Sequence, residues 1–277
     1  MALDLKRISF LLVLVAAKPA FSDDAVDIVR KAVTNDIGFF VAARDYTYLR
    51  HHVVTEFDKQ GARNKKDDRT DEILVLYGKP YAKLVQKDGI ALAEKEAARE
   101  EEKLNKEAAR RKKDEEKIAS AEAREREELK EAIEEITRAF DFRMTGTESL
   151  AGRESWKVEA TPKAGYEPKS RRARIYPKIS GHIWIDCKEH RLVKVVANVD
   201  EKISFGWFLL QLEPGAVFEH ERIRMDDGAW LPRRDLAKGR AKVAGLKTIE
   251  AEVVTSYSDY RRFQTDSGIV STSGPQD

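Results

Sequence analysis

The sequence predicts an α+β protein, in which an antiparallel β-sheet carries an N-terminal helix and a long charged helical insertion. Turn-forming residues recur about every ten residues through most of the chain, which is typical of an antiparallel meander. One apolar helical stripe precedes the first strand, and one long stretch without Gly or Pro separates two groups of strands. Strands and helices therefore occupy separate parts of the chain, as in α+β folds.

The first 22 residues have the features of a cleaved secretory signal peptide. A basic start, MALDLKR, precedes the apolar segment ISFLLVLVAA, and Ala20-Phe21-Ser22 offers small residues at the two positions that a signal peptidase reads. The apolar run has about ten residues, whereas a membrane-spanning helix needs ~20. We expect export with cleavage, and the alternative is a retained N-terminal anchor.

The charge balance argues against a nucleic-acid partner. The chain of 277 residues has 51 Lys and Arg against 49 Asp and Glu, a formal charge of +2. Residues 1–22 hold Lys6, Arg7 and Lys18 against Asp4, so the exported chain is close to neutral. General polyanion binders keep a clear positive excess. No other apolar run reaches membrane-spanning length, which predicts a soluble exported protein, peripheral to a membrane at most.

A helix and three strands are expected in the first third of the chain. Apolar residues in 22–46 step by three or four, as on one face of a helix: Val26, Val29, Val33, Ile37 and Phe40. Strands follow at 46–57, 70–78 and 81–86, with a turn at Gly78-Lys79-Pro80. Ile73 to Tyr77 are all apolar, which indicates a strand buried on both faces.

The charged insertion spans residues 90–139 and is expected to be helical. Residues 92–139 are rich in Ala, Glu, Lys and Arg, which are strong helix formers. Leu104 and Ile118 are the large apolar residues of its middle part, too few for a core. The last part of the insertion again has apolar residues at helical spacing: Leu129, Ile133, Ile136 and Phe140. We expect a solvated helix whose last three turns dock on the sheet.

Two questions about the insertion stay open from sequence. A continuous helix would reach ~70 Å, while a fold-back near Ala119-Ser120 would shorten it. Its role is that of a spacer held open by its own ion pairs, or that of a partner-binding or membrane-surface helix. The balanced mixture of charges argues against anionic lipid as its target.

After the insertion the strand pattern resumes. Eight runs of strand-forming residues, separated by turn residues, occupy 140–150, 154–162, 181–186, 191–203, 206–212, 216–225, 229–243 and 248–263. A Ser/Gly/Pro-containing tail, 265–277, is expected to be flexible. One sheet domain over residues 23–264 accounts for this pattern.

The sequence contains no recognised catalytic or cofactor-binding motif. It lacks G-x-S-x-G, H-E-x-x-H, a Walker loop and G-x-G-x-x-G. His51 and His52 are adjacent on a strand, so their side chains face opposite sides and cannot share a metal. We expect no catalytic residue, metal or cofactor. An unrecognised hydrolase acting through a carboxylate pair, such as Asp226-Asp227 or Glu219/Glu221, is the remaining enzymatic alternative.

The single cysteine and one basic run each allow a structural and a functional interpretation. Cys187 is the single cysteine and precedes His190 by three positions, but a structural zinc site needs four ligands. Cys187 is therefore either a turn residue or a free thiol open to modification. The basic run KSRRAR (169–174) is either a solvated loop balanced by the acidic helix or a contact for a lipid phosphate.

Large apolar residues on or beside the strands are the candidates for a ligand cavity. One sheet face can pack on the N-terminal helix, and the other side of that layer can form a hollow for a lipid-like ligand. The alternative is an ordinary sheet–helix core. The candidate ligand-binding residues are Val75, Tyr77, Trp156, Trp184, Trp207, Phe208, Leu210 and Trp230.

The order of elements resembles the periplasmic lipoprotein-carrier superfamily of the LolA/LolB type, including its RseB-type regulatory relatives. The segments GHIWID, FLLQLEPGAVFEHERI, DGAWLPRR and SYSDYRRF are similar to exported bacterial proteins described as outer-membrane lipoprotein-sorting-like. The resemblance covers most of residues 24–264, apart from the charged insertion. It implies a curved antiparallel β-sheet, an incomplete barrel, with helices over its concave side and an apolar cavity between.

The resemblance also implies a function. The protein is expected to bind a lipid, acyl chain or lipoprotein in an apolar cavity in the cell envelope, without catalysis. The alternative is a structural or sensory module that binds a protein partner through the charged helix at 92–139. On either hypothesis the expected location is the periplasm or another exported compartment.

Overall fold

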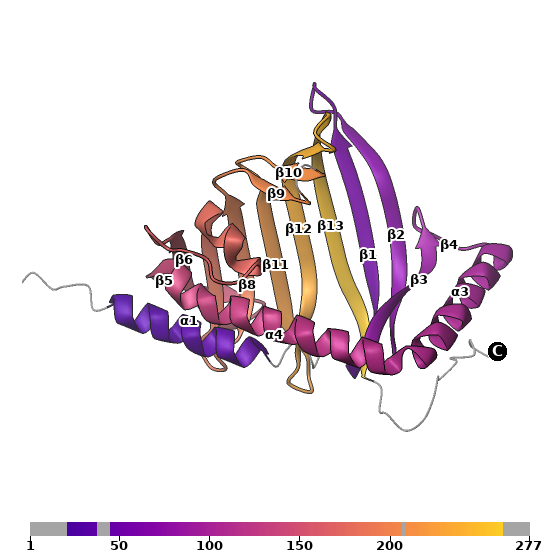
Figure 1. Ribbon diagram of the computed structural model, residues 1–277, viewed down its shortest axis with the longest axis horizontal. Helices are drawn as coiled ribbons and strands as arrows, with labels where there is room; N and C mark the ends of the chain where they lie inside the picture. Colours follow the sequence, from indigo (N-terminus) through magenta and orange to yellow (C-terminus); the bar gives the residue numbers. More distant parts are fainter. Residues whose placement is uncertain (1–20, 38–44, 207–208, 263–277) are drawn as a thin grey trace, which may run out of the picture.

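The computed structural model describes residues 21–37, 45–206 and 209–262 (Figure 1). Within these residues, one curved antiparallel sheet is accompanied by helices on one of its faces. The helical segments are α1 (Phe21–Ile37), α3 (Glu94–Lys113), α4 (Glu115–Ala139) and the 3-10 helix η2 (Arg172–Lys178). The strands are β1 (Tyr46–Phe57), β2 (Arg63–Leu76), β3 (Lys79–Lys87), β4 (Ile90–Ala91), β5 (Phe140–Leu150), β6 (Arg153–Pro162), β7 (Ile179–Asp186), β8 (Leu192–Val199), β9 (Ile203–Phe205), β10 (Leu210–Leu212), β11 (Val217–Arg224), β12 (Trp230–Val243) and β13 (Lys247–Arg262).

The sheet joins two meanders through its first and last long strands. Its order is β4-β3-β2-β1-β13-β12-β11-β8-β7-β6-β5, and the short strands β9 and β10 extend from β12. Because β1 pairs with β13, the N-terminal strands add to the C-terminal edge of the second meander. The sheet does not close, and this confirms the predicted α+β fold with an incomplete antiparallel barrel.

The charged insertion connects the two edges of the sheet. Its first helix, α3, follows the edge strand β4. Its second helix, α4, ends directly before β5, the strand at the opposite edge. Figure 1 shows α4 passing across the strands near one end of the sheet, beside α1. The insertion therefore spans the open side of the incomplete barrel.

The main core lies between α1, the end of α4 and strands β5 to β7. Successive side chains of a strand point to opposite faces. Val158 and Ile185 are fully buried toward α1, and we call this side of the sheet the helix face. The remaining buried core residues are Ala25, Val29, Ala32, Val33, Ala139, Phe140, Phe142 and Ala160. Ile133 and Ile136 of the predicted apolar stripe pack against them, as expected.

The first half of the insertion docks more firmly than its sequence predicts. The helix is interrupted at Asp114 and not near Ala119-Ser120. In α3, Leu104, Ala108 and Arg111 are buried. The Arg111 guanidinium donates hydrogen bonds to the carbonyl oxygens of Leu76, Lys79 and Pro80 at 3.2, 2.8 and 3.3 Å. An arginine within a charged run thus fixes α3 to the β2–β3 turn.

Several expectations fall outside the described residues. They concern the signal segment up to residue 20, Phe40 of the helical stripe, and the tail 265–277. In the described part of the chain, no helix combines the length and the apolar character that a membrane crossing requires.

Candidate functional site

A hollow of about 390 Å³ lies on the helix face over the middle of the sheet. Its wall comes from β8, β11, β12 and β13, four neighbouring strands of the second meander. The lining residues are Val195, Ala197, Phe218, Glu219, His220, Asp235, Leu236, Ala237, Val253 and Thr255. Ligand sites for small molecules measure about 300–1,000 Å³, so the hollow has room for part of such a molecule.

Strand register brings one row of apolar side chains together in the hollow. Ala197 pairs with Phe218, Phe218 with Ala237, and Ala237 with Val253. Paired residues of neighbouring antiparallel strands point to the same face, so these four form a continuous strip. Phe218 keeps 37% of its surface exposed although it lies in the interior of the sheet. Together with its aliphatic neighbours, this ring forms a contiguous apolar surface that a ligand can contact.

The adjacent row on the same face is polar. His220 pairs with Asp235, and Asp235 with Thr255. The Asp235 carboxylate lies 2.6 Å from His220 Nδ1 and accepts a 2.6 Å hydrogen bond from the Tyr257 hydroxyl. On the far side, His52 Nδ1 lies 3.0 Å from the Thr255 hydroxyl. The hollow is therefore apolar along one side and hydrogen-bonding along the other.

The polar row has defined protonation states. Burial raises the pKa of the Asp235 carboxyl, but the hydrogen bonds from His220 and Tyr257 outweigh it and hold that pKa below its usual range. Burial and the nearby Arg69 lower the pKa of His52. At neutral pH, Asp235 is therefore charged and His52 is neutral. Asp235 is thus the charged carboxylate of this row, and His220 and Tyr257 already donate hydrogen bonds to it.

The end of α1 is anchored beside the hollow by a buried ion pair. Arg222 lies two residues after His220 on β11, and its Nη1 donates a 2.6 Å hydrogen bond to Asp36 of α1. The two side chains are only 2% and 7% exposed. Such a pair fixes the position of α1 relative to β11, because either charge left alone would be strongly destabilising.

The structure spreads the sequence-predicted cavity residues over separate places. Trp156 packs against the main core, with its ring 5.1 Å from that of His190. Trp184 and Trp230 form a second cluster with Val193, and Trp184 points away from the helix face because it alternates with Ile183 and Ile185. In this cluster the indole nitrogens of Trp184 and Trp230 donate to Glu148 and Glu189, both at 2.8 Å.

The other described candidates, Val75, Tyr77 and Leu210, lie near strand ends. Val75 is half-buried near the end of β2, and Tyr77 follows in the β2–β3 turn. Leu210 is exposed on β10, whereas Trp207 and Phe208 lie outside the described residues. None of the described candidates lines the hollow. Their part in ligand binding stays a prediction.

Sequence reasoning missed the residues that do line the hollow. Phe218 and His220 alternate on one strand, and Asp235 and Ala237 alternate on another, which is a detectable two-residue period. The period does not say which strands are neighbours or in what register. The polar row requires three strands, so it becomes visible only in the folded sheet.

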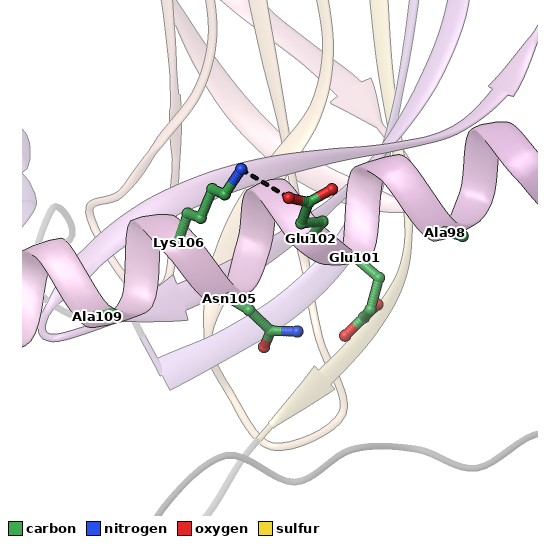
Figure 2. Close-up of a pocket in the computed structure, with 6 residues that line it drawn as sticks. All are labelled: Ala98, Glu101, Glu102, Asn105, Lys106 and Ala109. Atoms are coloured by element: carbon green, nitrogen blue, oxygen red, sulfur yellow. Dashed lines mark ion pairs between the residues drawn. The ribbon is translucent and has the colours of Figure 1, made fainter.

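A second, shallow hollow lies along the outer side of α3 (Figure 2). Its lining residues are Ala98, Glu101, Glu102, Asn105, Lys106 and Ala109, all from this one helix. Glu102 and Lys106 form an ion pair of 2.6 Å, and Glu101 accepts a 2.6 Å hydrogen bond from Lys83 of β3. This surface is open and its charged groups are paired, so it suits a protein contact better than a small ligand.

The basic run and the cysteine have plain structural roles. Arg172 lies 3.7 Å from Glu125 and 3.6 Å from Glu128 of α4, which agrees with a loop balanced by the acidic helix. Cys187 is half-buried in the turn after β7, and burial raises the pKa of its thiol. A raised thiol pKa lowers reactivity at neutral pH. The described residues contain no group of three potential metal ligands.

Comparisons with solved structures return matches of low sequence identity that cover most of the chain. The chain is similar to a putative outer membrane lipoprotein-sorting protein domain from Vibrio parahaemolyticus, at 10% identity, 89% and 95% coverage of the two chains, and a TM-score of 0.37. It is similar to a LolA superfamily protein from Nitrosomonas europaea, at 11% identity, 87% and 94% coverage, and a TM-score of 0.30. It is also similar to the MucA/MucB complex structure of Pseudomonas aeruginosa, at 11% identity, 84% and 94% coverage, and a TM-score of 0.25. No protein-family model and no curated protein matches the chain.

Proposed function

We propose that this protein is an exported binding protein for an amphiphile with an acyl chain, held in the hollow on the helix face without catalysis. The observation that carries the proposal is the apolar strip of exposed Phe218 and half-buried Ala197, Ala237 and Val253 in the interior of the sheet. Solvent exposure of such a strip costs free energy that an apolar ligand would recover, at ~25 cal/mol per Å² of apolar surface buried.

The polar row supports an amphiphile over a pure hydrocarbon. His220, Asp235 and Thr255 line the hollow directly beside the apolar strip. An acyl chain on the strip would place a hydroxyl or amide group of the same ligand within reach of these side chains. A free fatty-acid carboxylate fits less well, because Asp235 is negatively charged at neutral pH.

The exported location is part of the same proposal. The basic and apolar segments of residues 1–22 and the small residues at 20–22 support it. Mass spectrometry of the N terminus after expression in a bacterium tests it directly. A mature chain that begins near residue 23 is the expected result.

The binding proposal is tested by lipid analysis of two matched variants. Wild-type protein, Ala237→Phe in the hollow and Ala98→Phe on the outer side of α3 are purified and extracted with organic solvent. Mass spectrometry should find stoichiometric lipid with the wild type and with Ala98→Phe, and about tenfold less with Ala237→Phe, because a phenyl ring fills the hollow. Circular dichroism checks that both variants fold.

Two outcomes contradict the binding proposal. One is a clean extract from the wild type together with no uptake of a fluorescent fatty-acid or monoacylglycerol probe. The other is equal lipid content in Ala237→Phe and Ala98→Phe. Either result would move attention to the second candidate function.

The second candidate function is a protein interaction through α3. It is favoured by one observation, that Arg111 holds α3 on the sheet while Ala98, Asn105 and Ala109 face outward. A photo-crosslinking amino acid at Asn105, compared with one at exposed Lys59 in the β1–β2 turn, tests it in cells. A discrete crosslinked product from position 105 alone is expected on this hypothesis.

A further inference from the structure

Large exposed apolar side chains gather at one end of the sheet. Seven such side chains occur among the described residues, and five of them lie in β9, the turn before β10, β10 itself, the end of β12 and the turn before β13. We call these five the apolar end: Phe205, Leu209, Leu210, Val243 and Leu246, which are 44%, 63%, 37%, 37% and 90% exposed. Single exposed apolar residues are ordinary, but a cluster of this kind marks an interaction site.

Strand pairing holds the apolar end together as one surface. Leu210 pairs with Phe205 on one side and with Val243 on the other, so the three point to the same face. The backbone N–H of Ala244 donates a 2.8 Å hydrogen bond to the carbonyl oxygen of Leu209, which joins the two hairpin turns. Figure 1 shows β9, β10 and the end of β12 together at one end of the strands, opposite the end crossed by α4.

Cationic side chains accompany the apolar end. Lys247 pairs directly with Val243 and lies on the same face, and Lys242 precedes Val243 on β12 and points to the opposite face of the same end. Among the described residues, no carboxylate lies within 4.0 Å of the ammonium group of either lysine. Projecting aliphatic side chains beside lysines that have no carboxylate partner in the described part of the chain match a bilayer surface that contains anionic lipid, where the aliphatic side chains enter the acyl boundary and the lysines meet phosphates.

The apolar end continues into the hollow along β13. Val243, Ala241, Gly239 and Ala237 of β12 pair in turn with Lys247, Ile249, Ala251 and Val253 of β13. The last of these residues lines the hollow, and Ile249 and Ala251 are half-buried on the same face. An apolar path therefore leads from the exposed end to the hollow. A membrane that held this end would face the open end of that path.

We propose that the apolar end is a contact site for the surface of an anionic lipid bilayer. The site does not depend on what the hollow binds, so its test is separate from that of the proposed function. A second protein is the competing occupant. The bilayer fits better because Leu209 and Leu246 project from two turns and are 63% and 90% exposed, and Lys247 follows Leu246 directly.

Vesicle co-sedimentation of the exported protein tests the contact site. The vesicles contain phosphatidylethanolamine with phosphatidylglycerol, or phosphatidylcholine alone. The test variant combines Leu209→Asp with Leu246→Asp, and the matched control is Ile90→Asp, whose side chain is 72% exposed elsewhere in the molecule. A third variant combines Lys242→Glu with Lys247→Glu.

The proposal predicts a distinct pattern across these variants. Binding to phosphatidylglycerol vesicles should fall at least about tenfold in the leucine variant and remain unchanged in Ile90→Asp. The lysine variant should weaken binding about fivefold or more for each lysine on anionic vesicles, with little effect on phosphatidylcholine. Circular dichroism confirms that each variant folds.

Three results would overturn the proposal. Wild-type protein could fail to bind either kind of vesicle, or Ile90→Asp could lose binding as much as the leucine variant. Alternatively, sedimentation velocity could show a wild-type dimer that the leucine variant dissociates, without vesicle binding. That last result would assign the apolar end to a second copy of the chain.

Discussion

At the scale of single residues, buried charged side chains decide how the helices attach to the sheet. Glu135 of α4 is 2% exposed and accepts hydrogen bonds from the Tyr166 hydroxyl and from the backbone N–H groups of Lys169 and Ser170. Burial raises the pKa of Glu135, but these hydrogen bonds outweigh it and lower the pKa to about 2. The charged form therefore stabilises the contact between α4 and the loop before η2.

Removal of the Glu135 charge should destabilise the protein in a pH-dependent way. The folded-state pKa lies below the ordinary value of 4.5, so this stabilisation is complete above about pH 4.5 and is lost as the pH falls toward 2. Glu135→Gln should lower the free energy of unfolding by about 2–3 kcal/mol at pH 7, and by less at pH 3. Urea unfolding at both values measures it. The exposed neighbour Glu134→Gln is the control, and an equal loss in both variants would contradict the prediction.

The Asp36–Arg222 pair should respond differently to one substitution and to two. Arg222→Met leaves the Asp36 carboxylate buried without this partner and should cost about 3–5 kcal/mol of stability. The combined variant Asp36→Leu with Arg222→Met removes both charges and should recover most of that loss. Urea unfolding of the two variants measures the difference. If the double variant is as unstable as the single one, the prediction is wrong, because the loss of stability would then not come from an uncompensated buried charge.

At the scale of elements, the sparse apolar content of α3 does not prevent it from docking. Arg111→Ala removes three hydrogen bonds to backbone carbonyl oxygens at the β2–β3 turn. It should destabilise the protein by about 1–3 kcal/mol and raise amide hydrogen exchange across 94–113. Arg110→Ala is the matched control, because Arg110 is an exposed neighbour whose ion pairs, with Glu107 and Asp114, are local to the end of α3. Unchanged exchange in Arg111→Ala would show that Leu104 and Ala108 suffice to hold α3.

At the scale of the whole molecule, the order of strands interlocks the two halves of the chain. The half before Asp114 contributes α1 and β1, which contact α4 and β5 and pair with β13 of the other half. A specific protease site introduced after Lys113 should therefore give two fragments that stay together. Size-exclusion chromatography should show one species of the intact size, and only denaturant should separate the fragments. Separation without denaturant would show that the helical connection, not the β1–β13 pairing, holds the sheet together.

Some of this architecture could be read from the sequence, and some of the candidate site could not. The two-residue and three-to-four-residue periods are local, so they located α1, the main strands and the apolar stripe of Ile133 and Ile136. Arg111 was missed because its partners are backbone carbonyl oxygens far along the chain, which carry no side-chain signature. The face of β7 that Trp184 occupies is not readable from sequence, because aromatic character does not reveal to which side of a strand a side chain points.

The amino-acid sequence by itself determined the elements of this protein: an N-terminal amphipathic helix, a meander of strands and a charged helical connection. The spacing and type of neighbouring residues predict each of them. Only the tertiary structure decided that β1 joins β13, that α3 and α4 bridge the sheet edges, and that Phe218 and Ala237 meet beside His220 and Asp235. The physical reason is that strand register and strand order arise from hydrogen bonds between distant segments, and no local pattern records them.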